Sequence, residues 1–408
     1  MTAPVPGPLA GRRVLLVTFG SVLRPDGGLA VRARATIEAL VGLGAHLTVV
    51  SHHEPPEVAT ALAGDVDMVT LSRPLHLGFS TELVATVRAG ARWADLIVVE
   101  SALFLPAVIA AGPSAPIVWD TNECETLHYR RLPRSPGNLA RRLAWRFLEG
   151  WAARRVAIAV AISETEAEAW RRLFPRLAAR TVTVAHRAHA RPAAAWRPAG
   201  AGPATTVLLF VGNALGKHNA RAVAWLTEVL APQLPPSTVL VLAGRGTDVV
   251  PAAGGAAAGA APAAAGAARV IGLGLVDDID AVIAGADICL APLHAGAGVK
   301  TKVLHYLAHG KAVIATPAAM EGIEDAPGVT VAEMDGFAAA VLAAVGPGPA
   351  AAVGLGPAAA VGERAAAVTA TDWMERRHGA AVVAGQWADA LLPLLDHTLG
   401  QPAPDAPS

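Results

Sequence analysis

The chain has 408 residues, 53% of them hydrophobic and 16% charged, and its 33 basic and 33 acidic residues cancel. This length suits two domains of ordinary size, and so apolar a composition excludes an intrinsically disordered chain. The zero net charge argues against a nucleic-acid partner bound over the whole surface.

Cysteine usage and the N-terminus bear on location. Cys124 and Cys289 lie far apart and are too few for a disulfide framework or a metal cluster, so we expect buried thiols in a reducing cytoplasm. The first residues lack the features of a signal peptide. The apolar run 96–112 contains Glu100 and Pro106 and is too short to span a bilayer. We therefore expect a soluble, cytoplasmic protein.

Short apolar runs alternate with helical stretches along the first half of the chain. Strands are predicted at 12–19, 45–52, 94–101, 115–122 and 156–163. A helix is predicted from about Ala30 to Leu43. Continuous apolar strands separated by helices are typical of a parallel sheet covered on both faces. The sequence thus predicts a Rossmann-like domain over residues 1–190.

The same pattern restarts after a segment rich in Pro, Ala and Gly, which predicts a linker over 191–205. Strands are predicted at 206–216, 237–246, 268–274, 286–293 and 311–316. These indicate a second Rossmann-like, doubly wound α/β domain over 206–370, with a low-complexity surface excursion at 251–268. Residues 371–408 should form C-terminal helices that return towards the first domain, then a disordered tail. Ligands bind at the carboxyl ends of such strands, so we expect both halves to face one cleft.

The stretch "GAGVKTKVLHYLAHGKAVIAT" (296–316) carries the densest chemical signal. The chain has only four lysines, and three of them, Lys300, Lys302 and Lys311, lie here; the fourth is Lys217. We expect a helix from Lys302 to His309, with Thr301 as its N-cap and Gly310 as its end.

The start of this helix has the features of a phosphate site. Gly296 and Gly298 allow a close approach of a ligand to the backbone. A helix N-terminus carries roughly half a positive charge, and Lys300 and Lys302 add whole charges there. Lys311, at the start of the next strand, is interpreted as structural.

At this point the sequence resembles a known family. "GAGVKTKVLHYLAHGKAVIATPAAMEGI" is similar to the donor-sugar-nucleotide segment of the retaining GT-B glycosyltransferases of family 4. Further segments resemble that family in the same order: "PDGGLAVRARATIEALVGLGAHLTVVS" (25–51), "DTNECETLHYRR" (120–131), "AISETEAEAW" (161–170) and "FVGNALGKHNARAVAWLTEVLAPQL" (210–234). The resemblance implies a GT-B fold, with the acceptor bound by the first domain and a nucleotide-diphosphate sugar by the second.

The implied activity is transfer of a hexose or related sugar to a hydroxyl-bearing small molecule, lipid or glycan, with retention of configuration. Fixed positive charges and backbone N–H groups would neutralise the leaving group, so no metal and no cofactor beyond the nucleotide sugar is implied. The residues that the resemblance places around the donor and its phosphates are Gly27, Gly28, Asn213, Lys217, Gly296, Gly298, Val299, Lys300, Lys302 and His305.

Two family features differ in this chain. The second Glu of the family's Glu-x7-Glu motif is replaced by His305, and the first aligns with Ala295. The strand end that often carries a catalytic His has Asn122 instead. The catalytic candidates are Asn122, Glu123 and Glu100, and the acceptor-binding candidates are Asp120, Glu125 and His128.

These departures leave rival interpretations open. An inactive glycosyltransferase-like binding partner or auxiliary subunit would tolerate the lost Glu and His, but it would not need Lys217, Lys300 and Lys302. A sugar-nucleotide epimerase of the same two-domain shape is disfavoured by the family-like "GG" loop and the "GKHN" segment. The acidic run "DDID" (277–280) precedes an apolar helical run, so a helix N-cap is favoured over a metal motif.

One helix remains ambiguous. Residues 139–156 set Leu139, Leu143, Phe147 and Trp151 against several arginines. Such a basic amphipathic helix is typical of a membrane surface, but it is also what a helix covering a sheet requires. We favour the sheet-covering interpretation. His186 and His189 follow a strand and are a weak metal pair, because no carboxylate or Cys accompanies them.

Overall fold

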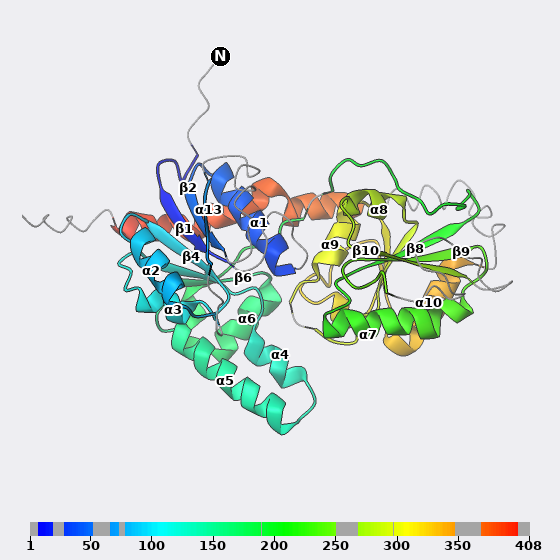
Figure 1. Cartoon of the computed structure of the whole chain (residues 1–408), viewed down its shortest axis with the longest axis horizontal. Helices are drawn as coiled ribbons and strands as arrows, with labels where there is room; N and C mark the ends of the chain where they lie inside the picture. Colours follow the sequence, from blue (N-terminus) through cyan, green and yellow to red (C-terminus); the bar gives the residue numbers. More distant parts are fainter. Residues whose placement is uncertain are drawn as a thin grey trace, which may run out of the picture. The chain divides into compact units, whose positions relative to one another are not determined.

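The structure is a computed structural model. It describes residues 7–18, 28–51, 66–72, 78–188, 190–249, 268–296, 298–346 and 369–398. The chain divides into two compact units, one formed by residues 1–187 together with 380–408 and the other by residues 188–379 (Figure 1). The backbone therefore passes between the units twice, at 187/188 and at 379/380.

The first unit is built on a seven-stranded parallel sheet in the order β3-β2-β1-β4-β5-β6-β7. Its strands are β1 (Arg13–Val17), β2 (His46–Ser51), β3 (Val66–Thr70), β4 (Leu96–Glu100), β5 (Ile117–Asp120), β6 (Ile158–Ala161) and β7 (Thr181–Thr183). The five predicted strands are confirmed. The edge strand β3 was not predicted, because it is only partly buried and carries Asp67 between its apolar residues.

Helices cover both faces of this sheet. They are α1 (Gly28–Gly42), α2 (Thr81–Gly90), α3 (Leu105–Ala110), α4 (Glu125–Arg131), α5 (Pro136–Ala152), α6 (Glu164–Leu173) and α13 (Ala380–Thr398). Val14 and Leu16 of β1 join a core with α1 and α13, whereas Leu15 and Val17 join a second core on the other face. Successive side chains of a strand point to opposite faces, so a strand with two covered faces is apolar throughout.

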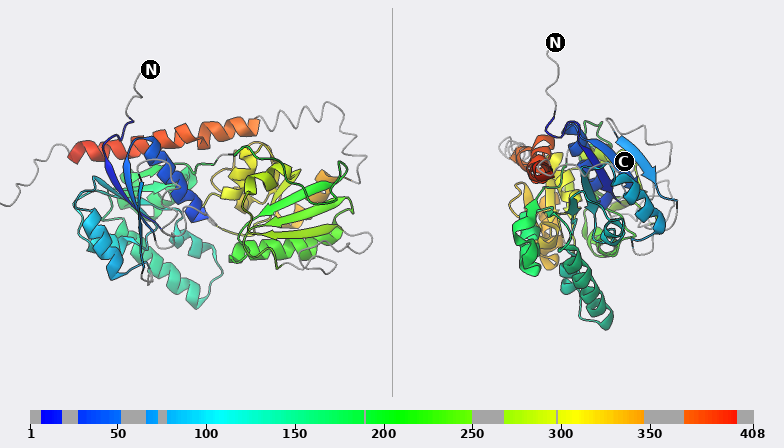
Figure 2. Two further views of the ribbon diagram at one scale, coloured as in Figure 1. Left: turned by 45° about the horizontal axis from the view of Figure 1, so that its top comes forward. Right: turned by 90° about the vertical axis from the view of Figure 1, so that its left-hand side faces the viewer.

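Helix α13 joins the first unit although it ends the described chain. Its Trp387 and Leu391 are fully buried in the core that Ile37 and Leu40 of α1 also form. Figure 2 shows the helix lying along α1 and the sheet of this unit. The core of the first unit is thus closed by residues from both ends of the sequence.

Helix α5 covers the sheet as predicted, but only in part with the predicted stripe of Leu139, Leu143, Phe147 and Trp151. The first three side chains are 54%, 59% and 76% exposed. Trp151 packs against the core, together with the buried Ala152 and the partly buried Trp145 and Leu148. The sheet-covering prediction is therefore confirmed for Trp151 and wrong for the other three residues, because a second apolar stripe of the same helix makes the remaining contacts.

The second unit contains a six-stranded parallel sheet in the order β10-β9-β8-β11-β12-β13. Its strands are β8 (Thr206–Val211), β9 (Thr238–Ala243), β10 (Arg269–Gly274), β11 (Ile288–Ala291), β12 (Ala312–Ala315) and β13 (Val329–Val331), and its helices include α7 (Lys217–Trp225), α8 (Ile279–Gly285), α9 (Thr301–Ala308) and α10 (Met334–Val345). The doubly wound α/β class is confirmed in both units.

The predicted linker 191–205 is bonded to the second unit along its length. Trp196 N donates to Ala281 O at 2.9 Å, and Arg197 Nη1 lies 3.0 Å from Asp287 Oδ1. Gly285 fits beneath it, since a Cβ there would come 1.7 Å from Trp196 O. Residues 191–205 therefore form a loop that packs against the second unit.

Both cysteines, Cys124 and Cys289, are free and buried as predicted, and burial raises the pKa of both thiols. Within the described ranges, no helix combines the length and hydropathy that crossing a membrane requires. Gly27, His189, nearly all of the low-complexity segment 251–268 and the tail from 399 lie outside the described residues.

Candidate functional site

The two sheets share one topological feature. In each sheet, the second and third strands are added on one side of the first strand and the fourth is added on its other side. As a result, β1 lies beside β4, and β8 lies beside β11. At such a switch point the loops leave the sheet on opposite faces, and ligands of open α/β sheets bind there, beyond the carboxyl ends of the strands. Most residues singled out from the sequence fall at these two places.

Lys302 occupies the switch point of the second unit. It lies in the first turn of α9, and its Nζ donates to Asn219 Oδ1 at 2.7 Å and lies 4.1 Å from the centre of the Phe210 ring. Burial, and then the neighbouring Lys300, lower the pKa of Lys302 to about 7. The side chain is partly buried, its amino group has one hydrogen-bond acceptor, and its charged form would be stabilised by an anion.

Glycines make this placement sterically feasible. A Cβ on Gly212, just after β8, would come 2.8 Å from Lys302 Nζ. Gly244, just after β9, has a φ of +124°, and a Cβ there would lie 2.3 Å from Gly212 O. A larger residue at Gly212 would fill the space that the lysine amino group reaches, and one at Gly244 would collide with the backbone of Gly212.

The start of α9 keeps its backbone donors free of side-chain caps. Lys300, and not Thr301 as predicted, is the N-cap, and it makes no side-chain capping hydrogen bond. Lys300 Nζ instead donates to Gly298 O at 2.6 Å, while Gly296 has a φ of +150°. Uncapped N–H groups beside two lysines are suited to an anion.

The remaining donor candidates are placed as follows. Asn213 O accepts from Asn219 Nδ2 at 3.1 Å, which joins Asn213 to the Lys302 contact. Lys217 is exposed at the first residue of α7. Val299 is only 8% exposed, so its backbone is the part available to a ligand. Gly28 begins α1 in the first unit.

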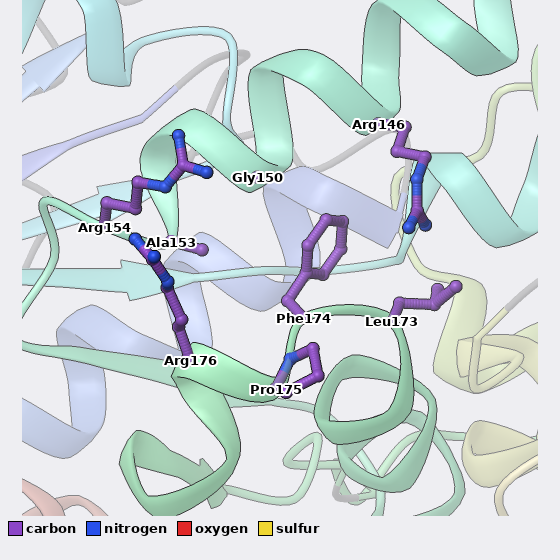
Figure 3. Close-up of a pocket in the computed structure, with 8 residues that line it drawn as sticks. All are labelled: Arg146, Gly150, Ala153, Arg154, Leu173, Phe174, Pro175 and Arg176. Carbon is purple, nitrogen blue, oxygen red and sulfur yellow. The ribbon is translucent and has the colours of Figure 1, made fainter.

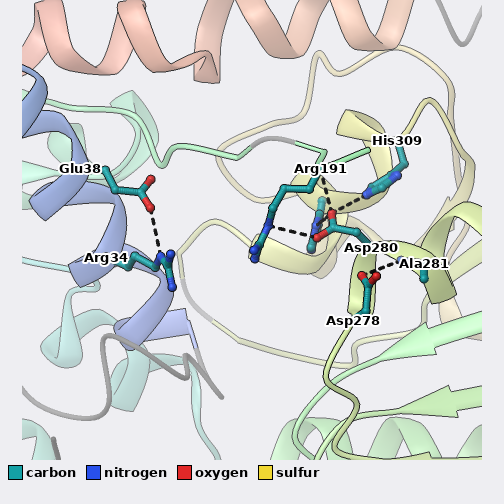
Figure 4. A network of polar contacts seen from close by, with 8 residues as sticks. Arg34, Glu38, Arg191, Asp278, Asp280, Ala281 and His309 are labelled. Carbon is teal, nitrogen blue, oxygen red and sulfur yellow. Dashed lines mark hydrogen bonds and ion pairs between the residues drawn. The ribbon is translucent and has the colours of Figure 1, made fainter. Parts of the chain in front are cut away.

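His305 is bonded within its own unit. Its Nε2 lies 2.9 Å from Asp280 Oδ1. His309 Nε2 lies 2.8 Å from the same oxygen (Figure 4). A carboxylate can only accept, so both Nε2 atoms donate, and in the neutral imidazole His305 Nδ1 is left as an acceptor. Burial alone would raise the pKa of Asp280, but the two histidine hydrogen bonds hold it well below its usual range.

The same trio is the one group in the described part of the chain whose ligand atoms converge closely enough for a metal ion. Arg191 already supplies positive charge there, since its Nε lies 3.4 Å from Asp280 Oδ2 and its N–H donates to Oδ1. We assign Asp280 as an anchor that ties α9 to α8. Asp278 of the "DDID" run caps α8 through Ala281 N at 3.0 Å, as predicted. Lys311 is structural as predicted, since its Nζ donates to Ala284 O and Ala286 O.

The switch point of the first unit is acidic. Glu100 ends β4, is fully buried and accepts a short hydrogen bond from Thr18 Oγ1, just beyond β1. It is in register with Asp120 of the neighbouring strand β5. Burial, and then the charge of Asp120, raise the pKa of Glu100 to about 8.

Asp120 is held by an arginine that the sequence did not single out. Arg32 of α1 is 2% exposed and forms a fork with both carboxylate oxygens, at 2.9 and 3.2 Å. Its remaining nitrogen donates to Ala185 O at 2.8 Å, and the group lies over the Trp387 ring. Both oxygens of Asp120 are therefore engaged inside the protein, which leaves it a positioning role.

Backbone strain marks the same edge. Among the described residues other than glycine, only Ser101 and Asn122 have positive φ, 76° and 53°. They follow the adjacent strands β4 and β5. The Asn122 side-chain amide nitrogen is buried without a hydrogen-bond partner. Strain of this kind clusters at functional sites.

Glu123, Glu125 and His128 lie on the loop and short helix after β5. Burial, and then Glu123 and Glu149, raise the pKa of Glu125 to about 8. Glu149 of α5, not predicted, is buried and accepts from Glu125 N at 2.9 Å and Thr126 N at 3.2 Å. His128 packs edge-on against Tyr129.

Comparison with known families covers most of the chain. The family described as "Glycosyl transferase 4-like domain" matches residues 27–184, and "Glycosyl transferases group 1" matches residues 205–346. Comparison with curated proteins gives no match.

Several solved structures have the same fold. HepE from Anabaena is 16% identical, with a TM-score of 0.64 and coverage of 94% of this chain and 100% of HepE. Sucrose-phosphate synthase from Thermosynechococcus elongatus is 15% identical, with a TM-score of 0.67 and coverage of 95% and 100%. A glycosyltransferase from Rickettsia africae is 13% identical, with a TM-score of 0.59 and coverage of 96% and 99%.

The two doubly wound units and the matched segments define the class of protein as a GT-B glycosyltransferase. The resemblance and fold predicted from the sequence are thereby confirmed. Within this class, the chain belongs to the family 4 glycosyltransferases.

Proposed function

We propose that the protein transfers a sugar from a nucleotide-diphosphate donor to a hydroxyl-bearing acceptor, with the donor diphosphate held at the switch point of the second unit. The observation that carries the proposal is Lys302, a partly buried amino group with a lowered pKa, beside Gly212 at the start of α9. HepE, which shares the fold, has been solved with UDP and with UDP-glucose. Those complexes make a uridine nucleotide the first donor to test.

The chemical role of Lys302 follows from its environment. In glycosyl transfer the departing nucleoside diphosphate gains negative charge as the bond to the sugar breaks. A preorganised cation in a water-poor site stabilises that charge strongly. Lys300 and the uncapped N–H groups of α9 add to this field. We therefore propose that the reaction needs no metal ion and no cofactor beyond the nucleotide sugar.

The acceptor side is proposed to lie at the carboxyl edge of β4 and β5. Asn122 offers an unpartnered amide donor there, and Glu125 has a pKa of about 8, which suits proton exchange with a hydroxyl near neutral pH. A sugar hydroxyl, a lipid hydroxyl or a small molecule fits this chemistry. Family membership supports retention and a hexose-type sugar, and the free thiols Cys124 and Cys289 fit a cytoplasmic location.

Calorimetry with UDP, GDP, ADP, TDP and their nucleosides tests the donor proposal. We expect Lys302→Ala to weaken nucleoside-diphosphate binding by about thirtyfold or more, the value of a charge-assisted hydrogen bond, and to leave nucleoside binding nearly unchanged. Lys217→Ala should act in the same direction. Lys311→Ala is the matched lysine control and should leave binding intact. Equal losses for nucleoside and diphosphate would exclude the phosphate role.

A second function, a binding partner without activity, is favoured by one observation. His305, at the position of a family Glu, is bonded to Asp280 and offers a single acceptor nitrogen. A protein that binds diphosphate but releases none from any nucleotide sugar, with any acceptor class supplied, would have this function.

A further inference from the structure

The outward face of α5 is apolar and unpaired in the described structure. Leu139, Leu143 and Phe147, here called the apolar ridge, recur every four residues and are more than half exposed. At 3.6 residues per turn they form one stripe, and the buried Ala152 lies on the opposite side of the helix. Figure 2 shows the N-terminal end of α5 extending away from the sheet of its own unit.

The surroundings of the ridge are strongly basic. Eight arginines lie between positions 130 and 155, in a chain whose formal net charge is zero. The acidic residues of α4 and α5 are Glu125, whose pKa is raised to about 8, and Glu149, which is buried and bonded to the start of α4. The α4–α5 hairpin is therefore a local patch of positive charge.

A pocket continues the same face towards the C-terminal end of α5. Arg146, Arg154 and Arg176, here called the arginine pocket, line a cavity of about 290 Å³ together with Phe174 and Gly150. In Figure 3, Arg154 and Arg176 lie on one side of Phe174 and Arg146 on the other. Arg146, Gly150 and Arg154 are four residues apart, so the pocket follows the stripe next to the ridge. Within the described ranges, none of the three arginines is paired with a carboxylate.

We propose that the apolar ridge and the arginine pocket together dock the protein on an anionic phospholipid bilayer, with the ridge in the acyl boundary and a lipid phosphate in the pocket. A bilayer surface presents anionic phosphates directly above an apolar layer. The arginine pocket matches the phosphates, and the neighbouring apolar ridge matches the apolar layer. A soluble phosphate would use the pocket but leave the ridge in water. The proposal goes beyond glycosyl transfer and stands without it.

Vesicle sedimentation of the full chain tests the proposal. We expect the protein to partition about tenfold more strongly onto phosphatidylcholine vesicles that contain phosphatidylglycerol than onto phosphatidylcholine alone, with the difference lost at high salt. The double variant Leu143→Ser/Phe147→Ser should lower partitioning by about tenfold, because both side chains lose apolar burial. Arg154→Gln/Arg176→Gln should reduce the preference for the anionic vesicles.

The controls separate docking from folding. Leu215→Ser, a change at an apolar side chain of the second unit that is 70% exposed, should leave partitioning unchanged. The ridge and pocket variants alter exposed residues of the first unit, so their thermal midpoints and UDP binding should match the parent. Absence of binding to anionic vesicles, or equal binding to both kinds, would overturn the proposal. So would a dimer in solution that the ridge variants dissociate, or saturation of the pocket by inorganic phosphate without vesicle binding.

Discussion

The two switch points have the same strand order and opposite charge. In the first unit, the ends of β1, β4 and β5 bring together two buried carboxylates, Glu100 and Asp120. In the second, the ends of β8 and β11 lead to the partly buried amino group of Lys302. The scaffold places the loops, and the residues that follow each strand decide which charge the edge holds.

The two edges also differ in how the buried charge is tolerated. Asp120 is neutralised by the fork of Arg32, and Glu100 by a raised pKa. Lys302 contacts the side-chain amide oxygen of Asn219 and an aromatic face, and in the described part of the chain it forms no ion pair with a carboxylate. The charges of the first edge are thus neutralised within the protein, whereas under the proposed function the charge of the second is neutralised by an anionic ligand. Four predictions test this contrast.

Breaking the internal neutralisation of the first edge should have the largest effect. Arg32→Met leaves Asp120 buried without its partner, and we expect the first unit to lose about 3–5 kcal/mol of unfolding free energy. Urea denaturation followed by tryptophan fluorescence measures it. Arg34→Met, which breaks the half-exposed pair with Glu38 on the same helix, should cost below about 1 kcal/mol. Similar losses for both would refute the contrast.

Removing the titration of Glu100 should stabilise the first unit at high pH. Its folded pKa of about 8 exceeds the ordinary value of 4.5, so the folded state keeps a proton that the unfolded state has lost. This group's contribution to stability therefore falls as pH rises between those values. We expect Glu100→Gln to gain about 1–3 kcal/mol at pH 9 and little at pH 4. Equal differences at both pH values would show that Glu100 is not protonated in the fold.

Diphosphate binding to the second edge should depend on pH in a defined direction. The bound anion favours the ammonium form of Lys302, whose pKa without ligand is about 7. Affinity should therefore fall by about tenfold as pH rises from 7 to 9, with proton uptake on binding. Calorimetry in two buffers of different ionisation enthalpy measures the uptake. Lys302→Ala should abolish it, and uptake that persists in this variant would assign the proton to another group.

The smallest effect is expected at His305. Its Nδ1 can accept one neutral hydrogen bond from a ribose hydroxyl, so His305→Ala should weaken nucleotide binding by about 1 kcal/mol at pH 8. His309→Ala removes the other imidazole on Asp280 and is the control. If both variants lose the same affinity, Asp280 acts by holding α9 and not through the ribose.

Much of the fold could be predicted because buried parallel strands are short apolar runs. The strands that the prediction omitted were at the edges: β3 is partly buried, and β13 has only three residues. For α5, the pattern shows two apolar stripes, and sequence alone does not decide whether Leu148 or Phe147 faces the core. Packing decided it in favour of Leu148.

The candidate site could be predicted only in part. Lys302 was found because lysine is rare in this chain and two glycines precede it. Its partner Asn219 is 83 residues away, and Arg32 is 88 residues from Asp120. No local pattern reveals such pairs. Arg32, an arginine inside an otherwise apolar helix face, was the one visible hint.

Helix α13 has a consequence for how the protein is made. The first unit needs Trp387 and Leu391 in its core, yet the ribosome produces residues 188–379 before it reaches them. At about 5–20 residues per second, those 192 residues take roughly 10–40 s to synthesise. During that interval the apolar surface of α1 that α13 will cover is open to chaperones and to other nascent chains. The second unit can therefore fold on the ribosome while the first, although it emerges earlier, is completed last.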